Sequence, residues 1–365
     1  MHLPKPGPDN GQFLTTEVRP RTKPTSITSR AISFPRNHYT APPNVAGGFH
    51  LLDLSHKAPA VRANLVGSDI TKEGFVVGIE TWDRGVLYQA GATWIEHKRG
   101  GRECGFGQFD TRDVASVEEG EVKITNGHAK VPRKLRINGR KDSLDTNGID
   151  SSYEIDYQHK QRQSFSKRIK FPSKLRGGKQ PPEVVCWLNR LDLQNWKGRG
   201  HRLHAFAGDV TTESATFTLE TWGDSVLNGA AMCYIAFPKG KRKVDSGYFS
   251  THDVEDEDEE GGQVGRRGKE IRNRVEFREG WFTKPPTILC ALSMFDLGGE
   301  ADLKIKVEAL DVDKDGFTWC LSTWVRLYHE WTMATFTNEI HRTTRFYTPQ
   351  GPRGLLSGLN ERFKR

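Results

Sequence analysis

Apolar and polar residues alternate with a period of two in three separate segments, which is the pattern of β-strands that bury one face. The faces predicted to be buried hold Phe75, Val77, Ile79 and Thr81; Phe217, Leu219 and Thr221; and Phe317, Trp319, Leu321 and Thr323. A Trp follows each of these Thr residues and belongs to the opposite, polar face. No segment has convincing helical periodicity, so the alternation predicts an all-β protein of antiparallel sheets.

These strands belong to a unit that occurs three times. Residues 42–53, 181–192 and 285–296 align without a gap, and each begins with Pro-Pro and ends with Asp. Each is preceded by a Gly-x-Phe opening and followed by a Thr-Trp pair. Such self-similarity indicates one module read three times. We assign repeat 1 to residues 10–97, repeat 2 to 105–239 and repeat 3 to 245–340, followed by a basic tail at 341–365.

The repeats differ most in the loop after the opening Phe. In repeat 2 this loop carries a polar insertion at about 120–165, and residues 129–179 hold fourteen Lys and Arg against five Asp and Glu. Because the whole chain has a net charge of +8, the positive charge belongs to this region and not to the repeated module. In repeat 3 the same loop holds an acidic run at 255–260. Both segments are typical of solvated loops.

Composition limits the class of protein. The five Cys residues are odd in number and lack C-x-x-C spacing, so neither a disulfide framework nor a zinc site is indicated. Cys186 and Cys290 occupy equivalent positions where repeat 1 has Gly47, as small buried side chains do. No apolar run reaches the roughly 18 residues of a membrane helix, and the first residues do not resemble a signal peptide. We expect a cytoplasmic protein without a membrane span, with release by a non-classical route left open.

No catalytic or cofactor motif stands out, since the chain has no G-x-S-x-G, P-loop or dinucleotide fingerprint. Residues 311–316 imitate the start of an EF-hand loop, but the twelfth position is Ser322, and the repeat alignment places a turn there. The repeated Asp53, Asp192 and Asp296 are interpreted as turn residues that follow strands. The prediction is a protein that is not an enzyme, with no cofactor and no metal site.

The order of these elements is familiar. Pro-Pro-x-Val, an Asp, an Arg on the next strand, Gly-Phe and Thr-Trp-x-x-x-Val-x-Tyr together resemble the H-type lectin domain of snail agglutinins and the discoidins. Repeat 1 matches best, with Thr-Trp-Asp-Arg-Gly-Val-Leu-Tyr at 81–88, while repeat 2 has Asn228 in place of Tyr88. The resemblance implies a six-stranded antiparallel β-sandwich that assembles as a trimer. It also implies binding of galactose or N-acetylgalactosamine between neighbouring subunits.

The resemblance also implies candidate site residues. In the family, an Arg and first-loop polar residues act from one subunit, and the Trp, its successor and a Tyr act from the next. Carried over by position, the candidates are Arg62, Trp82, Asp83 and Tyr88 in repeat 1; Arg202, Trp222, Gly223 and Asn228 in repeat 2; and Lys304 and Trp324 in repeat 3. Arg62 and Trp82 are thus expected to belong to two different composite sites.

These residue types suit a sugar. A rigid aromatic ring covers the apolar face of the sugar at little entropic cost, and the guanidinium fork of Arg can hold two oxygens, whereas Lys acts as a point charge. Lys304, together with Val325 and Glu330 at the other two positions, therefore predicts a weakened or altered third site.

The joins between repeats are short, at residues 97–106 and 239–246. A sandwich with an even number of alternating strands begins and ends at the same end, so such a join can step to an adjacent domain. We therefore hypothesise that the three sandwiches pack as an intramolecular pseudo-trimer and that the chain is a monomer.

Other interpretations stay open. The repeated Trp could cover a sheet or fill an inter-domain interface, Arg62 could be an ordinary strand-surface residue, and Tyr88 could lie at the edge of the core. The chain could also be a structural or protein-interaction module with decayed sugar sites, whose basic insertion binds a protein partner or nucleic acid. Nucleic acid is less favoured, since no recognised nucleic-acid fold surrounds the insertion.

Overall fold

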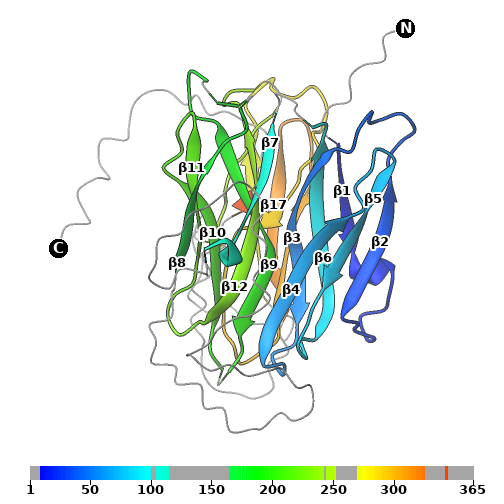
Figure 1. Cartoon of the computed structure of the whole chain (residues 1–365), viewed down its shortest axis with the longest axis vertical. Helices are drawn as coiled ribbons and strands as arrows, with labels where there is room; N and C mark the ends of the chain where they lie inside the picture. Colours follow the sequence, from blue (N-terminus) through cyan, green and yellow to red (C-terminus); the bar gives the residue numbers. More distant parts are fainter. Residues whose placement is uncertain are drawn as a thin grey trace, which may run out of the picture.

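The computed structural model describes residues 9–99, 104–114, 164–173, 175–176, 178–196, 198–241, 244–251, 269–324 and 342–343. These residues are almost entirely β-structure (Figure 1). The strands are β1 (Asp9–Leu14), β2 (Ile27–Ser33), β3 (Asn44–Leu54), β4 (Ala60–Ser68), β5 (Gly74–Glu80), β6 (Leu87–His97), β7 (Gly105–Asp110), β8 (Ser164–Lys170), β9 (Glu183–Gln194), β10 (His201–Gly208), β11 (Ser214–Glu220), β12 (Leu227–Phe237), β13 (Lys269–Glu276), β14 (Ala291–Leu292), β15 (Met294–Leu297), β16 (Leu303–Leu310), β17 (Gly316–Thr323) and β18 (Arg342–Thr343). Two short 3-10 helices, η1 (Thr15–Glu17) and η2 (Thr111–Asp113), follow β1 and β7.

The sheets do not stop at the ends of the repeats. One six-stranded sheet has the order β2-β5-β4-β9-β12-β7, so β4 of repeat 1 pairs with β9 of repeat 2. A second has the order β1-β6-β3-β16-β17-β13 and joins β3 of repeat 1 to β16 of repeat 3. A four-stranded sheet, β15-β10-β11-β8, joins repeats 2 and 3. Each repeat therefore pairs with both of the others, and the three pairings form a closed cycle.

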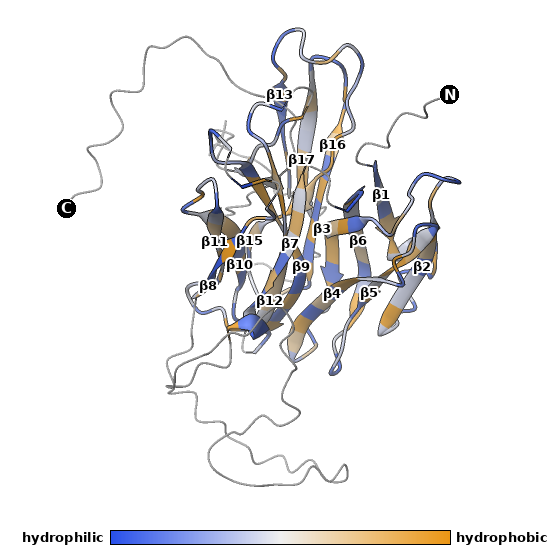
Figure 2. Cartoon of the chain, turned by 45° about the horizontal axis from the view of Figure 1, so that its top comes forward, coloured by the Kyte–Doolittle hydropathy of each residue, from blue (hydrophilic) through white to orange (hydrophobic). Residues whose placement is uncertain are grey.

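Each sandwich is filled by the faces that the alternation predicted to be buried. Phe75, Phe217 and Phe317, at equivalent positions of β5, β11 and β17, are at most 4% exposed. Hydrophobic and hydrophilic residues alternate along the strands (Figure 2). The predicted core faces are confirmed for these strands, because a strand buried on one side must place every second residue in the core.

A second, smaller core contains equivalent residues of all three repeats, including Ala46, Val185 and Leu289. The next inward position holds Gly48, Trp187 and Ala291. A Cβ atom on Gly48 would lie 2.5 Å from the Cβ of Trp187 and 3.0 Å from the Cβ of Ala291. Trp187 is fully buried. One large side chain therefore occupies the space that two small residues leave free.

Several expectations fall on residues outside the described part of the chain: nearly all of the basic insertion, the acidic run, most of the tail, and both Val325 and Glu330. The EF-hand-like stretch is a turn between β16 and β17, as the repeat alignment predicted. There the Asp313 carboxylate accepts hydrogen bonds from the backbone amides of Asp315 and Gly316, at 2.8 and 2.7 Å. In the described residues, no helix is long and apolar enough to cross a membrane.

Candidate functional site

Nine of the ten candidate residues, all except Trp324, lie at the three seams where repeats pair, which we call junctions 1–2, 2–3 and 3–1 after the repeats that meet. At each seam an Arg or Lys near the start of one strand faces an Asp near the end of its partner strand. The facing pairs are Arg62 and Asp192, Arg202 and Asp296, and Lys304 and Asp53. Because antiparallel partners place these strand ends together, all three junctions form at the same end of the sheets.

Junction 1–2 brings together residues of β4, the loop after β5, β9 and β12. Arg62 donates from Nε to Asp192 Oδ1 at 3.0 Å and from Nη1 to the Asp83 carbonyl oxygen at 2.9 Å. Asn228 Nδ2 donates to the same Asp192 oxygen at 3.0 Å. The Arg62 guanidinium carbon lies 5.9 Å from the centroid of the partly buried Trp82 ring. Two repeats thus contribute an indole, a guanidinium, a carboxylate and an amide to one place.

The backbone at this junction is constrained. Asp83 has a φ of +44°, in the left-handed region, and its side chain is 76% exposed. Asp tolerates this conformation better than most residues, and such backbone outliers are frequent at ligand-binding sites. Repeat 2 has Gly223 at the same position with a φ of +65°. The turn therefore keeps one conformation in both repeats, with a carboxylate in one and no side chain in the other.

Junction 2–3 has the same plan. Arg202 Nε lies 2.9 Å from Asp296 Oδ1, and Arg202 Nη1 also bonds the Asp224 carboxylate. Burial raises the pKa of Asp296, while Arg202 and a hydrogen bond from Trp222 oppose the change. A Cβ on Gly223 would lie 3.0 Å from Arg202 Nη1, so the missing side chain leaves room for the guanidinium.

Junction 3–1 departs most from this plan on the side of repeat 3. The ammonium of Lys304 lies 3.1 Å from Asp302 Oδ2. Asp302 also belongs to repeat 3, so this ion pair does not cross the seam. Trp324 is partly buried. With one point charge in place of a guanidinium fork, repeat 3 contributes fewer directed donors to this junction.

Repeat 1 supplies the other half of junction 3–1. Arg21 Nε donates to the fully buried Asp53 at 2.6 Å, and the Arg21 guanidinium carbon lies 5.2 Å from the Tyr88 ring centroid. Tyr88 Oη donates to Ser55 Oγ at 3.4 Å. Burial raises the pKa of Asp53, and Arg21 counteracts this by hydrogen bonding and charge. Arg21 lies in the first loop, so this loop does reach a junction, as the family resemblance implied.

The grouping of residues differs from the expected one. Arg62 and Trp82 were expected in two different composite sites, but they lie together at junction 1–2, and Tyr88 lies at junction 3–1. The reason is topological: β4 and the loop after β5 border the same edge of repeat 1, while β3 and the start of β6 border the other edge.

The interpretation of the repeated Asp residues as turn residues was wrong. Asp53, Asp192 and Asp296 lie within β3, β9 and β15. Each faces a basic residue of the partner strand across a seam. Their identical position in all three repeats was the available signal. An acid that ends a strand in a single repeat is indistinguishable from a turn residue until its partner strand is known.

Aromatic and charged side chains lie close together at the junctions. Partly buried aromatic rings lie beside guanidinium and carboxylate groups, which can hold hydroxyls, and among the described residues no group of His, Cys, Asp and Glu is arranged to hold a metal ion. No curated protein matches the chain. The model of the H-type lectin domain matches residues 29–95, 166–237 and 272–331, one segment in each repeat and more than half of the chain. The chain therefore belongs to the H-type lectin domain family, with three tandem copies of the domain, which indicates a carbohydrate-binding lectin.

Proposed function

We propose that the protein is a non-enzymatic lectin that binds galactose- or N-acetylgalactosamine-type glycans at the junctions between its repeats. The observation that carries this proposal is the convergence of Arg62 and Trp82 from repeat 1 with Asp192 and Asn228 from repeat 2. Family membership supports a sugar ligand, and the convergence supports a site built by two repeats.

Each group has a definite task in such a site. The Trp82 ring offers an apolar surface to the C–H face of a sugar, at a low cost in side-chain entropy. The Arg62 guanidinium has five donors in a fixed fork and uses two of them on Asp192 and Asp83, which leaves donors for sugar oxygens. Asp192 and Asn228 offer acceptors to sugar hydroxyls. Hydroxyl recognition of this kind supplies most of the specificity in a polar site.

The three junctions are proposed to differ in affinity. Junction 1–2 has the Arg, the Trp and the Asp that follows the Trp, and junction 2–3 has Gly223 in place of that Asp. Junction 3–1 combines Tyr88 with Lys304, which cannot make a bidentate contact. We expect affinity to fall in that order.

We further propose that the chain works as a monomer in which the closed cycle of strand pairings replaces the subunit interfaces of a trimer. The strand edges that meet at the three seams are already paired within the described part of the chain, so these edges cannot recruit two further copies. Light scattering should give a mass near 41.2 kDa. A stable trimer of chains would contradict this part of the proposal.

The direct test is a glycan array followed by calorimetric titration with N-acetylgalactosamine. Trp82→Ala should lower affinity at junction 1–2 by at least about tenfold, since aromatic anchors dominate small binding sites. The matched control is Tyr248→Ala, which removes a ring that is 47% exposed and donates to the Val184 carbonyl near the start of β9, at the other end of that strand from Asp192. An array without galactose-type binding, or equal titrations for Trp82→Ala and the native protein, would contradict the proposal.

A further inference from the structure

Arg190 on β9 is specific to repeat 2. The equivalent residues of repeats 1 and 3 are Leu51 and Met294, so repeat 2 alone has an Arg at this position, where it adds a second guanidinium beside Trp82. The guanidinium carbon of Arg190 lies 5.5 Å from the Trp82 ring centroid, and its side chain is 14% exposed. Arg190 therefore borders the proposed sugar site while lying largely out of water.

Arg190 shares its carboxylate partner with a second Arg. Its Nη1 donates to Asp110 Oδ1 at 3.3 Å, and this is its one carboxylate contact among the described residues. Asp110 is already held by Arg112, whose Nε lies 3.0 Å from both carboxylate oxygens and whose Nη2 lies 2.6 Å from Oδ2. Two guanidinium groups thus share one carboxylate as their direct partner, while Asp192 attracts Arg190 and Asp113 attracts Arg112 without a direct contact. Burial lowers the pKa of Arg190, which reflects the cost of holding this charge away from water.

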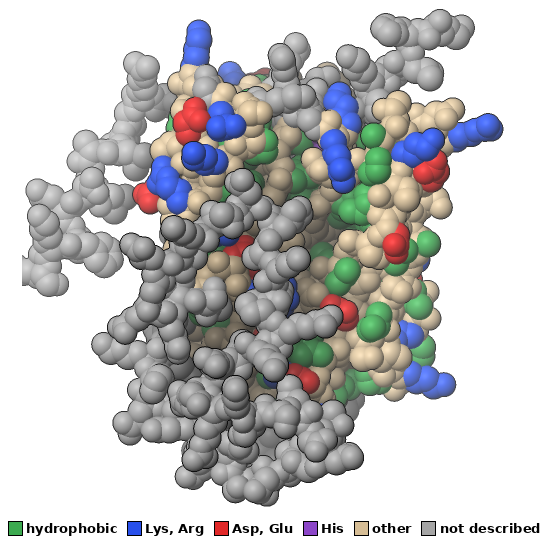
Figure 3. Space-filling view, in the orientation of Figure 1, with side chains coloured by type: hydrophobic (Ala, Val, Ile, Leu, Met, Phe, Trp, Pro, Cys, Tyr) green, Lys and Arg blue, Asp and Glu red, His purple; other side chains and the backbone are tan. Residues whose placement is uncertain are grey.

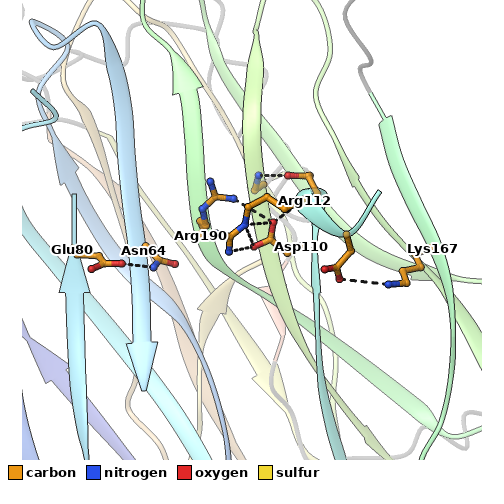
Figure 4. Close-up of polar contacts among 9 residues, drawn as sticks. Asn64, Glu80, Asp110, Arg112, Lys167 and Arg190 are labelled. Atoms are coloured by element: carbon orange, nitrogen blue, oxygen red, sulfur yellow. Dashed lines mark hydrogen bonds and ion pairs between the residues drawn. The ribbon is translucent and has the colours of Figure 1, made fainter. Parts of the chain in front are cut away.

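The residues around Arg190 leave space for its guanidinium and leave the neighbouring Arg112 open to solvent. A Cβ on Gly229 would lie 3.2 Å from Arg190 Nη1, so the glycine leaves room for the guanidinium. Arg112 is 68% exposed, which opens the pair to solvent. Asn64, which faces Arg190 across the seam, is bound to Glu80 at 2.6 Å, and no hydrogen bond links these two residues to the Arg190–Asp110–Arg112 group (Figure 4). Acidic and basic side chains are interspersed over the part of the face in Figure 3 that is not drawn in grey.

We propose that Arg190 and Arg112 form an anion subsite adjoining Trp82, which binds a sulfate or carboxylate group on the glycan held at junction 1–2. This inference rests on the proposed function. An anionic group there would compensate a guanidinium that now shares its carboxylate, and charge-assisted hydrogen bonds from Arg to such groups are short and directional. Junctions 2–3 and 3–1, with Met294 and Leu51 in place of Arg190, would take the neutral sugar only.

The test compares calorimetric titrations with galactose, galactose-6-sulfate and galacturonic acid. The native protein should bind at least one of the anionic sugars about tenfold more tightly than galactose, a gain that shrinks at high salt. Arg190→Leu installs the residue of repeat 1 and should remove this preference while changing galactose affinity by less than about twofold. Arg190→Lys should keep part of the preference, because it keeps the charge and loses the fork.

Arg168→Leu is the control for net charge, since Arg168 is an exposed residue of β8 away from the junction. A thermal melt should show that the Arg190 variants fold, because Asp110 keeps Arg112 as its partner. Galactose binding without any preference for an anionic sugar, or a preference that survives Arg190→Leu, overturns the subsite alone. No binding of any of the three sugars overturns the proposed function and the subsite together.

Discussion

His201, at the start of β10, is fully buried, and neither of its ring nitrogens has a hydrogen-bond partner in the part of the chain that the structure describes. Burial lowers the pKa of His201 to about 4, with His56 and Arg202 adding to the effect. His50 behaves alike, since burial also lowers its pKa to about 4. The fold therefore holds both rings neutral, and acid favours the unfolded chain.

The first prediction concerns this histidine. The unfolded chain binds a proton near the ordinary pKa of about 6.5, so each ring should remove up to about 3 kcal/mol of stability as pH falls from 6.5 to 4. Urea unfolding of the native protein and His201→Leu at pH 7 and pH 4.5 measures the difference. The variant should lose markedly less stability on acidification. Equal losses in the two proteins would show that His201 is not held neutral.

A second prediction has the opposite sign. Glu96 is 5% exposed, and burial, helped by Asp9 opposite it, raises its pKa to about 7. Stability from the protonated acid is lost as pH rises from about 4.5 to 7, so Glu96→Gln should stabilise the fold by about 1–3 kcal/mol at pH 8 and by little at pH 4.5. Chemical denaturation at both pH values checks this. If Glu96→Gln is no more stable than the native protein at pH 8, the buried Glu96 carboxylate does not destabilise the fold.

At the scale of the strands, the seam between β4 and β9 contains an ion pair that is largely buried. Arg62 and Asp192 have side chains that are only 14% and 10% exposed, so each depends on the other for compensation. Removal of one partner of such a pair costs about 3–5 kcal/mol, because it leaves a buried charge unpaired. Exposed pairs contribute little by comparison.

The third prediction follows from that difference. Asp192→Ala should destabilise the protein by about 3 kcal/mol in urea unfolding, whereas Glu73→Ala, whose pair with Lys72 is more than half exposed on both sides, should change stability by less than about 0.5 kcal/mol. Similar small effects for the two variants would show that β4 and β9 do not rely on this seam contact.

Period-two alternation predicted the buried faces of β5, β11 and β17, because one-sided burial imposes that pattern within a single strand. The partner strand across a seam has no such local signature. Asp192 and Arg190 were therefore not among the predicted site residues, although the pairing of β4 with β9 brings them beside Arg62 and Trp82. Candidates such as Trp82 and Arg62 came instead from family resemblance, which also misjudged how they group.

For the whole molecule, the shared core of Gly48, Trp187 and Ala291 favours a covalent chain over three identical subunits. Three copies of Trp187 would crowd a space in which even a Cβ on Gly48 lies 2.5 Å from its neighbour. Three copies of Gly48 would leave that space empty. Unequal residues at equivalent positions thus fit a ring whose repeats occupy fixed places.

A fourth prediction tests this packing. Gly48→Trp alone should overpack the core and Trp187→Gly alone should leave a cavity, each at a cost of about 3 kcal/mol or more. The double variant moves the indole to another repeat and should recover a large part of both losses in thermal or urea unfolding. Losses that simply add would mean that the three positions do not share one space.

The central claim is that one sugar site is built by two repeats, and the number of binding sites measures it most directly. Calorimetric titration with N-acetylgalactosamine gives that number for the native protein, for Trp82→Ala in repeat 1, for Asn228→Ala in repeat 2, and for the double variant. The account predicts that each single variant loses or weakens the same one site and that the double variant loses no further site. Loss of two separate sites in the double variant would place the two residues in different sites and contradict the account.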